Sequence, residues 1–162
     1  MIATDYLLDK FGLTIITDVK LPSYLDAIIV KNNIYTKPGM SEKEQYCVIA
    51  EEVSHKIYTA GNILEKRSVS NEKQEVFAKR KTFDYLISLE SLIECNNLGM
   101  RDFYEVADHL NITEEFLRSG IEYYKEKYGI MHFDKKTQSF FYFGSTIQIF
   151  KEDHGNLLEP FL

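Results

Sequence analysis

The pattern of apolar and polar positions in the first part of the chain predicts a short helix followed by strands. Apolar residues recur at helical spacing over residues 4–11, whereas the β-branched residues of 13–17 are typical of a strand. Two further apolar runs flank Asn32 and Asn33 within residues 27–36. Asparagine tolerates the positive φ of tight turns, so this stretch predicts a β-hairpin, whose free edge could hold an extended peptide by strand addition.

Two capping boxes indicate where the next helices begin. Ser41 and Glu44 open a helix that Gly61 ends, and residues 71–74 open a long helix that continues to about Asn96. The apolar positions of this second helix recur at helical spacing and are expected in the core; they are Val76, Phe77, Phe83, Leu86, Ile87 and Ile93.

The last third of the chain predicts a helical hairpin and then a β-hairpin. Helical patterns over residues 101–110 and 113–127 flank a short turn, and strand patterns follow over 130–143 and 147–150. The two helices resemble a helix-turn-helix, but the second carries several glutamates that a phosphate backbone would repel. We therefore expect a packing or partner-docking hairpin rather than a DNA reader.

Together these elements predict one domain of the α+β class. Its parts are a core with a small antiparallel sheet and two helices over residues 5–98, a helical hairpin packed on it over 99–129, a C-terminal β-hairpin region over 130–151 and a tail over 152–162. A chain of 162 residues suits a single hydrophobic core.

Composition and charge narrow the classes of function. The net charge of −6 argues against general binding to nucleic acid or to acidic membranes. No stretch approaches the ~18 apolar residues of a membrane span, and the N-terminal residues do not match a signal peptide. Cys47 and Cys95 are expected as small buried thiols rather than as a disulfide. We expect a cytoplasmic protein that contacts neither nucleic acid nor membrane directly.

The helix that follows the hairpin contains the strongest chemical signal in the chain. Glu51 and His55 are spaced i and i+4 and share one helix face, and Glu52 can point toward the same volume from the side. The motif, E-E-x-x-H, differs by one residue from the zinc-binding H-E-x-x-H, in which the glutamate is the general base. The alternative is a chance cluster on a solvated helix face, which the strongly apolar flanks of the motif disfavour.

A third carboxylate is available near the start of the next predicted helix. Glu75 lies in its first turn and could complete a site with Glu51 and His55, and Glu72 is the fallback one turn earlier. The alternative interpretation is that Glu72 and Glu75 complement the helix dipole near its N-terminus.

Three stretches of the chain resemble the ImmA/IrrE metallopeptidases, small zincins of phages, mobile elements and bacteria. They read Ile-Ala-Glu-Glu-Val-Ser-His over residues 49–55, Tyr-Thr-x-Gly-Asn-Ile over 58–63 and Lys-Gln-Glu-x-x-Ala-x-Arg over 73–80. The resemblance covers residues 5–129 and implies a zincin-like fold. It implies that Glu52 is the general base and that the metal ligands are Glu51, His55 and Glu75.

The resemblance also implies a partner and a metal. Members of the family cleave repressors that have a helix-turn-helix domain and so derepress phage or mobile-element genes. The implied metal is Zn²⁺, but two carboxylates and one imidazole would leave a site of about zero net charge and weaker Lewis acidity. Such oxygen-rich ligation favours Mn²⁺ or another hard divalent ion as the alternative. Two functions remain: a repressor-cleaving metallopeptidase, or a relative of low or no activity that acts as an antirepressor by binding.

Overall fold

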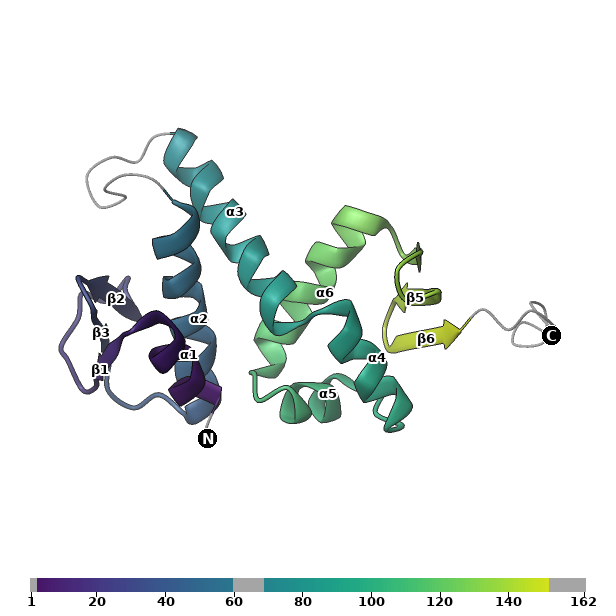
Figure 1. Ribbon diagram of the computed structural model, residues 1–162, viewed down its shortest axis with the longest axis horizontal. Coiled ribbons are helices and arrows are strands. Elements are labelled where there is room, and N and C mark those ends of the chain that lie inside the picture. Colours follow the sequence, from purple (N-terminus) through teal and green to yellow (C-terminus); the bar gives the residue numbers. More distant parts are fainter. Residues whose placement is uncertain (1–2, 60–68, 152–162) are drawn as a thin grey trace.

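The computed structural model describes residues 3–59 and 69–151, and its elements form two groups connected by the helix α3 (Val69–Leu86; Figure 1). The first group consists of α1 (Ala3–Phe11), β1 (Thr14–Ile16), β2 (Ala27–Val30), β3 (Asn33–Thr36) and α2 (Glu42–Tyr58). The second consists of α4 (Leu89–Asn97), α5 (Phe103–His109), α6 (Glu114–Tyr128), β4 (Met131–Asp134), β5 (Ser139–Phe143) and β6 (Ile147–Lys151). The described part of the protein is therefore α+β, as expected, with helices and two three-stranded sheets.

The N-terminal sheet is mixed rather than antiparallel. Its strand order is β1-β3-β2, with β1 parallel and β2 antiparallel to β3. The expectation of an antiparallel sheet is wrong here because β1 and β2 are not neighbours. The segment that connects them leaves room for β3, which lies between the two strands and pairs with both. The predicted hairpin is confirmed, but its turn lies one residue earlier than the expected Asn32-Asn33. Lys31 takes the positive φ (58°), and Asn33 already belongs to β3, where it pairs with Val30. The strand β2 forms one edge of the sheet.

The helix α2 begins with the capping box that the sequence predicts. The Oγ of Ser41 accepts a hydrogen bond from the N–H of Glu44 (3.2 Å), and the Glu44 carboxylate accepts one from the N–H of Ser41 (2.7 Å). At the other end, the N–H and the hydroxyl of Thr59 both donate to the carbonyl of His55. The expected end of the helix at Gly61 lies outside the described residues.

The long second helix expected from the sequence is wrong in two respects. It begins at Val69, ahead of the expected cap at residue 71. The chain also leaves the helix before Ser88, because the hydroxyl of Ser88 caps a new helix, α4, by accepting a hydrogen bond from the N–H of Ser91 (3.0 Å). The chain changes direction there, and α4 contacts α5 and β6.

Only part of the apolar pattern of α3 is core. Phe83, Leu86 and Ile87 are buried as expected, but Val76 and Phe77 are about half exposed. The difference follows from the neighbours of the helix, since α3 packs against α2 but meets α6 only near its C-terminal end (Figure 1). Helical spacing identifies an apolar face, but it does not tell how much of that face another element covers.

The helical hairpin and the β-hairpin predicted for the last third are confirmed. Asp102 and Thr113 cap α5 and α6 with their side chains, and Gly129 ends α6 with φ 85°, a conformation that favours glycine. The strands β4, β5 and β6 form an antiparallel sheet in that order, with Phe133 paired to Phe140.

A single hydrophobic cluster extends through both groups, from Leu7 in α1 to Ile149 in β6. Gly120 permits the close approach of α6 to the end of α3, because a Cβ there would lie 2.3 Å from Cδ1 of Ile87. The hydroxyl of the buried Tyr124 donates a hydrogen bond to the carbonyl of Ile87 (2.5 Å). The end of α3 is therefore firmly tied to α6.

Both cysteines, Cys47 and Cys95, are buried and free, as the sequence suggests. Among the helices that the structure describes, none combines the length and the apolarity needed to cross a membrane.

Candidate metal and catalytic site

The helices α2 and α3 bring together two of the three predicted metal ligands. His55 lies in the last turn of α2, and Glu75 lies in the first half of α3, which starts beside that end (Figure 1). The Nε2 of His55 lies 3.3 Å from Oε2 of Glu75, with the two side chains 20% and 46% exposed. A nitrogen and a carboxylate oxygen thus converge where solvent still reaches them.

The other ring nitrogen of His55, Nδ1, is buried and has no hydrogen-bond partner among the described residues. The imidazole therefore presents Nε2 to Glu75 and to solvent, and Nε2 is the atom that could serve as a ligand. A metal-binding histidine usually donates its second N–H to an acceptor, and the described residues supply none at this Nδ1.

Glu51, the first predicted ligand, lies one turn before His55 on α2 and is half-buried. Its side chain lines a pocket of about 290 Å³ together with Asp26, Lys37 and Lys79. Burial raises the pKa of Glu51, the positive charge of Lys79 opposes the rise, and the carboxylates of Asp26 and Glu75 add to it. Glu51 therefore lies within the electrostatic reach of Glu75.

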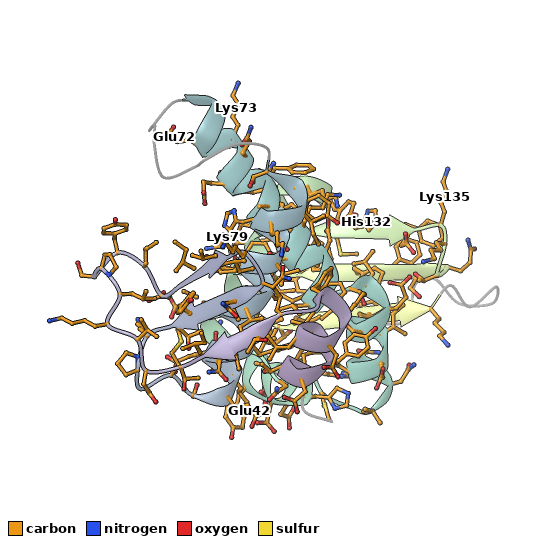
Figure 2. All side chains as sticks on the ribbon, turned by 60° about the vertical axis from the view of Figure 1, so that its left-hand side comes forward. Glu42, Glu72, Lys73, Lys79, His132 and Lys135 are labelled. Atoms are coloured by element: carbon orange, nitrogen blue, oxygen red, sulfur yellow. The ribbon has the colours of Figure 1, made fainter. Side chains whose placement is uncertain are left out.

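Of the three predicted ligands, His55 and Glu75 are in contact, whereas Glu51 lies one turn from His55 on α2. Within residues 3–59 and 69–151, no three His, Cys, Asp or Glu side chains are grouped closely enough to hold a metal ion. Glu51 shares the helix face of His55 by its i,i+4 spacing and would have to turn its side chain to join the pair. The fallback ligand, Glu72, is exposed near the outer end of α3, with Lys79 further along (Figure 2).

Glu52, the predicted general base, is half-buried on the next position of α2. Burial raises the pKa of its carboxyl to about 7, and the negative charges of Glu51 and Glu75 contribute. A favourable interaction with the backbone N–H of Ile29 opposes the rise. Glu52 thus lies within electrostatic range of Glu51 and Glu75, the two predicted carboxylate ligands, and next to the strand β2.

The strand next to Glu52 has a free edge. In the described part of the chain β2 pairs only with β3, and its face contacts α2. This agrees with the expectation that residues 27–36 offer an exposed edge beside the motif helix. An extended peptide that added to this edge would run past Glu52.

The donor set fits a divalent metal ion chemically. An imidazole nitrogen and a carboxylate oxygen from two helices already face each other, and a second carboxylate is on the same face of α2. Two oxygen donors and one nitrogen donor suit Zn²⁺ as well as the harder Mn²⁺.

Sequence reasoning missed two charged neighbours of Glu51. Lys79 follows Glu75 by four residues on α3, so helical spacing could have placed it at the site. Asp26 comes to the same pocket through the position of the β-hairpin, which no local pattern of the sequence encodes.

Comparisons of the chain with family models, with curated proteins and with solved structures gave no match. The function of the protein is therefore inferred from its residues and their geometry.

Proposed function

We propose that this protein is a zincin-like, metal-dependent endopeptidase of the ImmA/IrrE type that cleaves a helix-turn-helix repressor. The observation that carries the proposal is the 3.3 Å approach of His55 Nε2 to Glu75 Oε2 across two helices. A solvent-accessible imidazole that faces a carboxylate supplies two of the three donors that such a site needs, and Glu51 can supply the third by turning its side chain.

In this proposal Glu51, His55 and Glu75 hold the metal ion. A bound divalent ion supplies Lewis acidity for attack on a peptide carbonyl. Two carboxylates and a neutral imidazole would give the occupied site a net charge of about zero. We therefore propose Zn²⁺ as the metal, with Mn²⁺ as the alternative.

Glu52 acts as the general base. Its carboxylate oxygen takes a proton from the attacking water and passes it to the nitrogen of the leaving amine. The edge of β2 positions the substrate, because backbone hydrogen bonds to a free strand edge hold a peptide extended. Both roles are supported by the favourable interaction of the Glu52 carboxylate with the backbone of Ile29, a residue of the edge strand β2.

The test compares Glu52→Gln with Glu42→Gln, an exposed position at the start of the same helix (Figure 2). Purified protein is loaded with Zn²⁺ or Mn²⁺ and incubated with a helix-turn-helix repressor from the same genome. Cleavage by Glu52→Gln should fall ~10²–10⁴-fold, because positioned proton transfer contributes that much, while metal content and repressor binding stay unchanged. Glu42→Gln should cleave like the parent.

The alternative function is an antirepressor that works by contact alone. It would be favoured if the parent and Glu52→Gln derepressed a reporter equally and left the repressor uncut. In that case the peptidase proposal is wrong, and the polar pocket at Glu51 becomes part of a binding surface.

A further inference from the structure

A second cavity lies on another side of α2 from the carboxylate site. Successive residues of a helix are rotated by about 100°, so Ala50, Val53 and Ile57 face away from Glu51 and His55. These three residues line a cavity of about 150 Å³ formed between α1, α2 and α3. The buried residues that line it are apolar apart from Ser54; besides Ala50 and Val53 they include Leu7 of α1.

Two lysines stand at this cavity, each held against aromatic rings. The Nζ of Lys10 lies 5.4 Å from the ring centroid of Tyr85, and the Nζ of Lys81 lies 5.3 Å from that of Phe77. Contacts of this length are favourable cation–π interactions and fix the ammonium groups near the opening. Neither lysine is in an ion pair with a described residue.

Large apolar side chains at the cavity are partly exposed to solvent. Ile57 is 50% exposed and Tyr85 is 47% exposed, and both line the cavity. Large apolar side chains gathered at one place on the surface of a soluble protein mark interaction sites more often than isolated ones do. A ligand that covered Ile57 and Tyr85 would remove this apolar surface from water.

Charge and size together define that ligand. No aspartate or glutamate of the described residues lines the cavity, although the chain as a whole has a net charge of −6. An anionic group would therefore find two cations here that no described residue pairs with, in an otherwise repulsive field. An apolar cavity of ~150 Å³ is known to accept a benzene molecule, so this one has room for a single aromatic or large aliphatic side chain.

The cavity and the side chains of Lys10, Ile57, Lys81 and Tyr85 beside it are called the groove. We propose that this groove binds a short acidic segment of another protein. One aromatic or large aliphatic side chain of the segment enters the cavity over Ala50 and Val53, and flanking carboxylates pair with Lys10 and Lys81. A peptide fits better than a membrane lipid, since the cavity holds one side chain and not an acyl chain. The groove is separate from Glu51, Glu52 and His55, so this proposal does not depend on the peptidase proposal.

A random dodecapeptide library displayed on phage tests the proposal on the full chain. Selection on the immobilised parent should enrich peptides in which a large apolar residue is flanked by aspartate or glutamate. The enriched peptide, labelled with a fluorophore, is then titrated against variants by anisotropy. The Lys10→Glu/Lys81→Glu double variant should bind at least about tenfold more weakly, because like charges now oppose each other.

The matched control is Lys20→Glu/Lys135→Glu, which changes the total charge equally at two exposed lysines away from the groove (Lys135 is labelled in Figure 2). It should bind the peptide within about twofold of the parent, because only distant screened charges change. Ile57→Ser should also weaken binding while thermal unfolding shows that each variant is folded.

Three results would overturn the proposal. The first is a selection that enriches no acidic peptide with a large apolar residue. The second is equal loss of binding in the two double variants, which would indicate general electrostatics. The third is binding of the parent to phosphatidylglycerol vesicles that the groove variants lose while peptide binding persists, which would identify a membrane surface as the ligand.

Discussion

Each half of α3 contains a phenylalanine, but the two rings have different surroundings. Phe77 in the first half is 47% exposed, whereas Phe83 in the second half is 4% exposed. The ring of Phe83 lies 5.0 Å from that of Phe116 and 5.8 Å from that of Tyr123, both on α6. The ring of Phe77 meets Tyr58 edge-on at 5.8 Å and lies near the ammonium of Lys81.

The polar contacts of α3 divide in the same way. Near its end, Asp84 accepts a hydrogen bond from the hydroxyl of Tyr123 (3.2 Å) and pairs with Lys127 (3.4 Å), both of α6. Near its start, Glu75 faces His55 and solvent. One helix therefore anchors the fold at one end and exposes polar groups at the other, so the two ends should respond differently to mutation.

The largest expected effect is on stability, and it separates the two phenylalanines. Phe83→Ala removes a buried ring and should lower the free energy of unfolding by ~3–5 kcal/mol, because the cavity it leaves cannot fully collapse. Phe77→Ala, its control on the same helix, should lower it by no more than about 1 kcal/mol, because the ring is half exposed. Urea denaturation measures both values. Similar losses for the two variants would contradict the division of α3.

The next effect concerns metal binding at the exposed end. Glu75→Gln should weaken the binding of Zn²⁺ or Mn²⁺ by at least the ~10–100-fold that loss of an outer-shell partner costs, because it replaces a charged carboxylate donor by a neutral, weaker amide oxygen. Glu72→Gln, one turn earlier on α3 and exposed, should bind the metal like the parent. Isothermal titration gives the affinities.

Thermal unfolding provides an independent reading of the same pair. Metal at 100 times its Kd should stabilise a binding protein by ~2.7 kcal/mol, since only the folded state binds it. The parent and Glu72→Gln should show this increase and Glu75→Gln should not. If Glu75→Gln gains as much stability from metal as the parent does, Glu75 is not a ligand.

The sequence predicts best where the signal is local. The capping box at Ser41, the hairpin of residues 27–36 and the end of α6 at Gly129 are each encoded by neighbouring residues, and the structure confirms them. The cap at Ser88 is local too, but a continuous apolar pattern obscured it. The exposure of Phe77 depends on which element lies opposite, which no local pattern contains.

Local sequence patterns likewise predict only part of the candidate site. Helical spacing places Glu51 and His55 on one face of α2, and the approach of Glu75 to His55 agrees with the prediction. The parallel pairing of β1 with β3, which sets the position of β2 beside Glu52, arises from long-range topology. The pocket beside Glu51, with Asp26 in its wall, depends on the same arrangement.

A smaller effect is expected where the second half of α3 contacts α2. The hydroxyl of the buried Thr82 donates a hydrogen bond to Oγ of Ser54 (2.9 Å) and so joins α3 to α2. Thr82→Val should lower the free energy of unfolding by ~0.5–1.5 kcal/mol, because a buried hydrogen bond is lost. Combining it with Ser54→Ala should add less than the sum of the two single changes, since both remove the same bond. Simple additivity would show that this bond does not couple the helices.

The smallest expected change in stability comes with a change in metal preference. Glu51→His restores the H-E-x-x-H pattern on α2 and replaces a carboxylate oxygen by an imidazole nitrogen. The ratio of Zn²⁺ to Mn²⁺ affinity should rise, because imidazole suits Zn²⁺ and carboxylate suits Mn²⁺. The free energy of unfolding without metal should stay within about 1 kcal/mol of the parent, because the side chain is only half-buried at the accessible end of the helix pair.

Glu51→Gln is the control, since its amide keeps the size of glutamate and removes the charge. It should weaken the binding of both metals without raising the ratio of their affinities. If Glu51→His leaves the ratio unchanged while Glu75→Gln abolishes binding, the metal is held by His55 and Glu75 without Glu51.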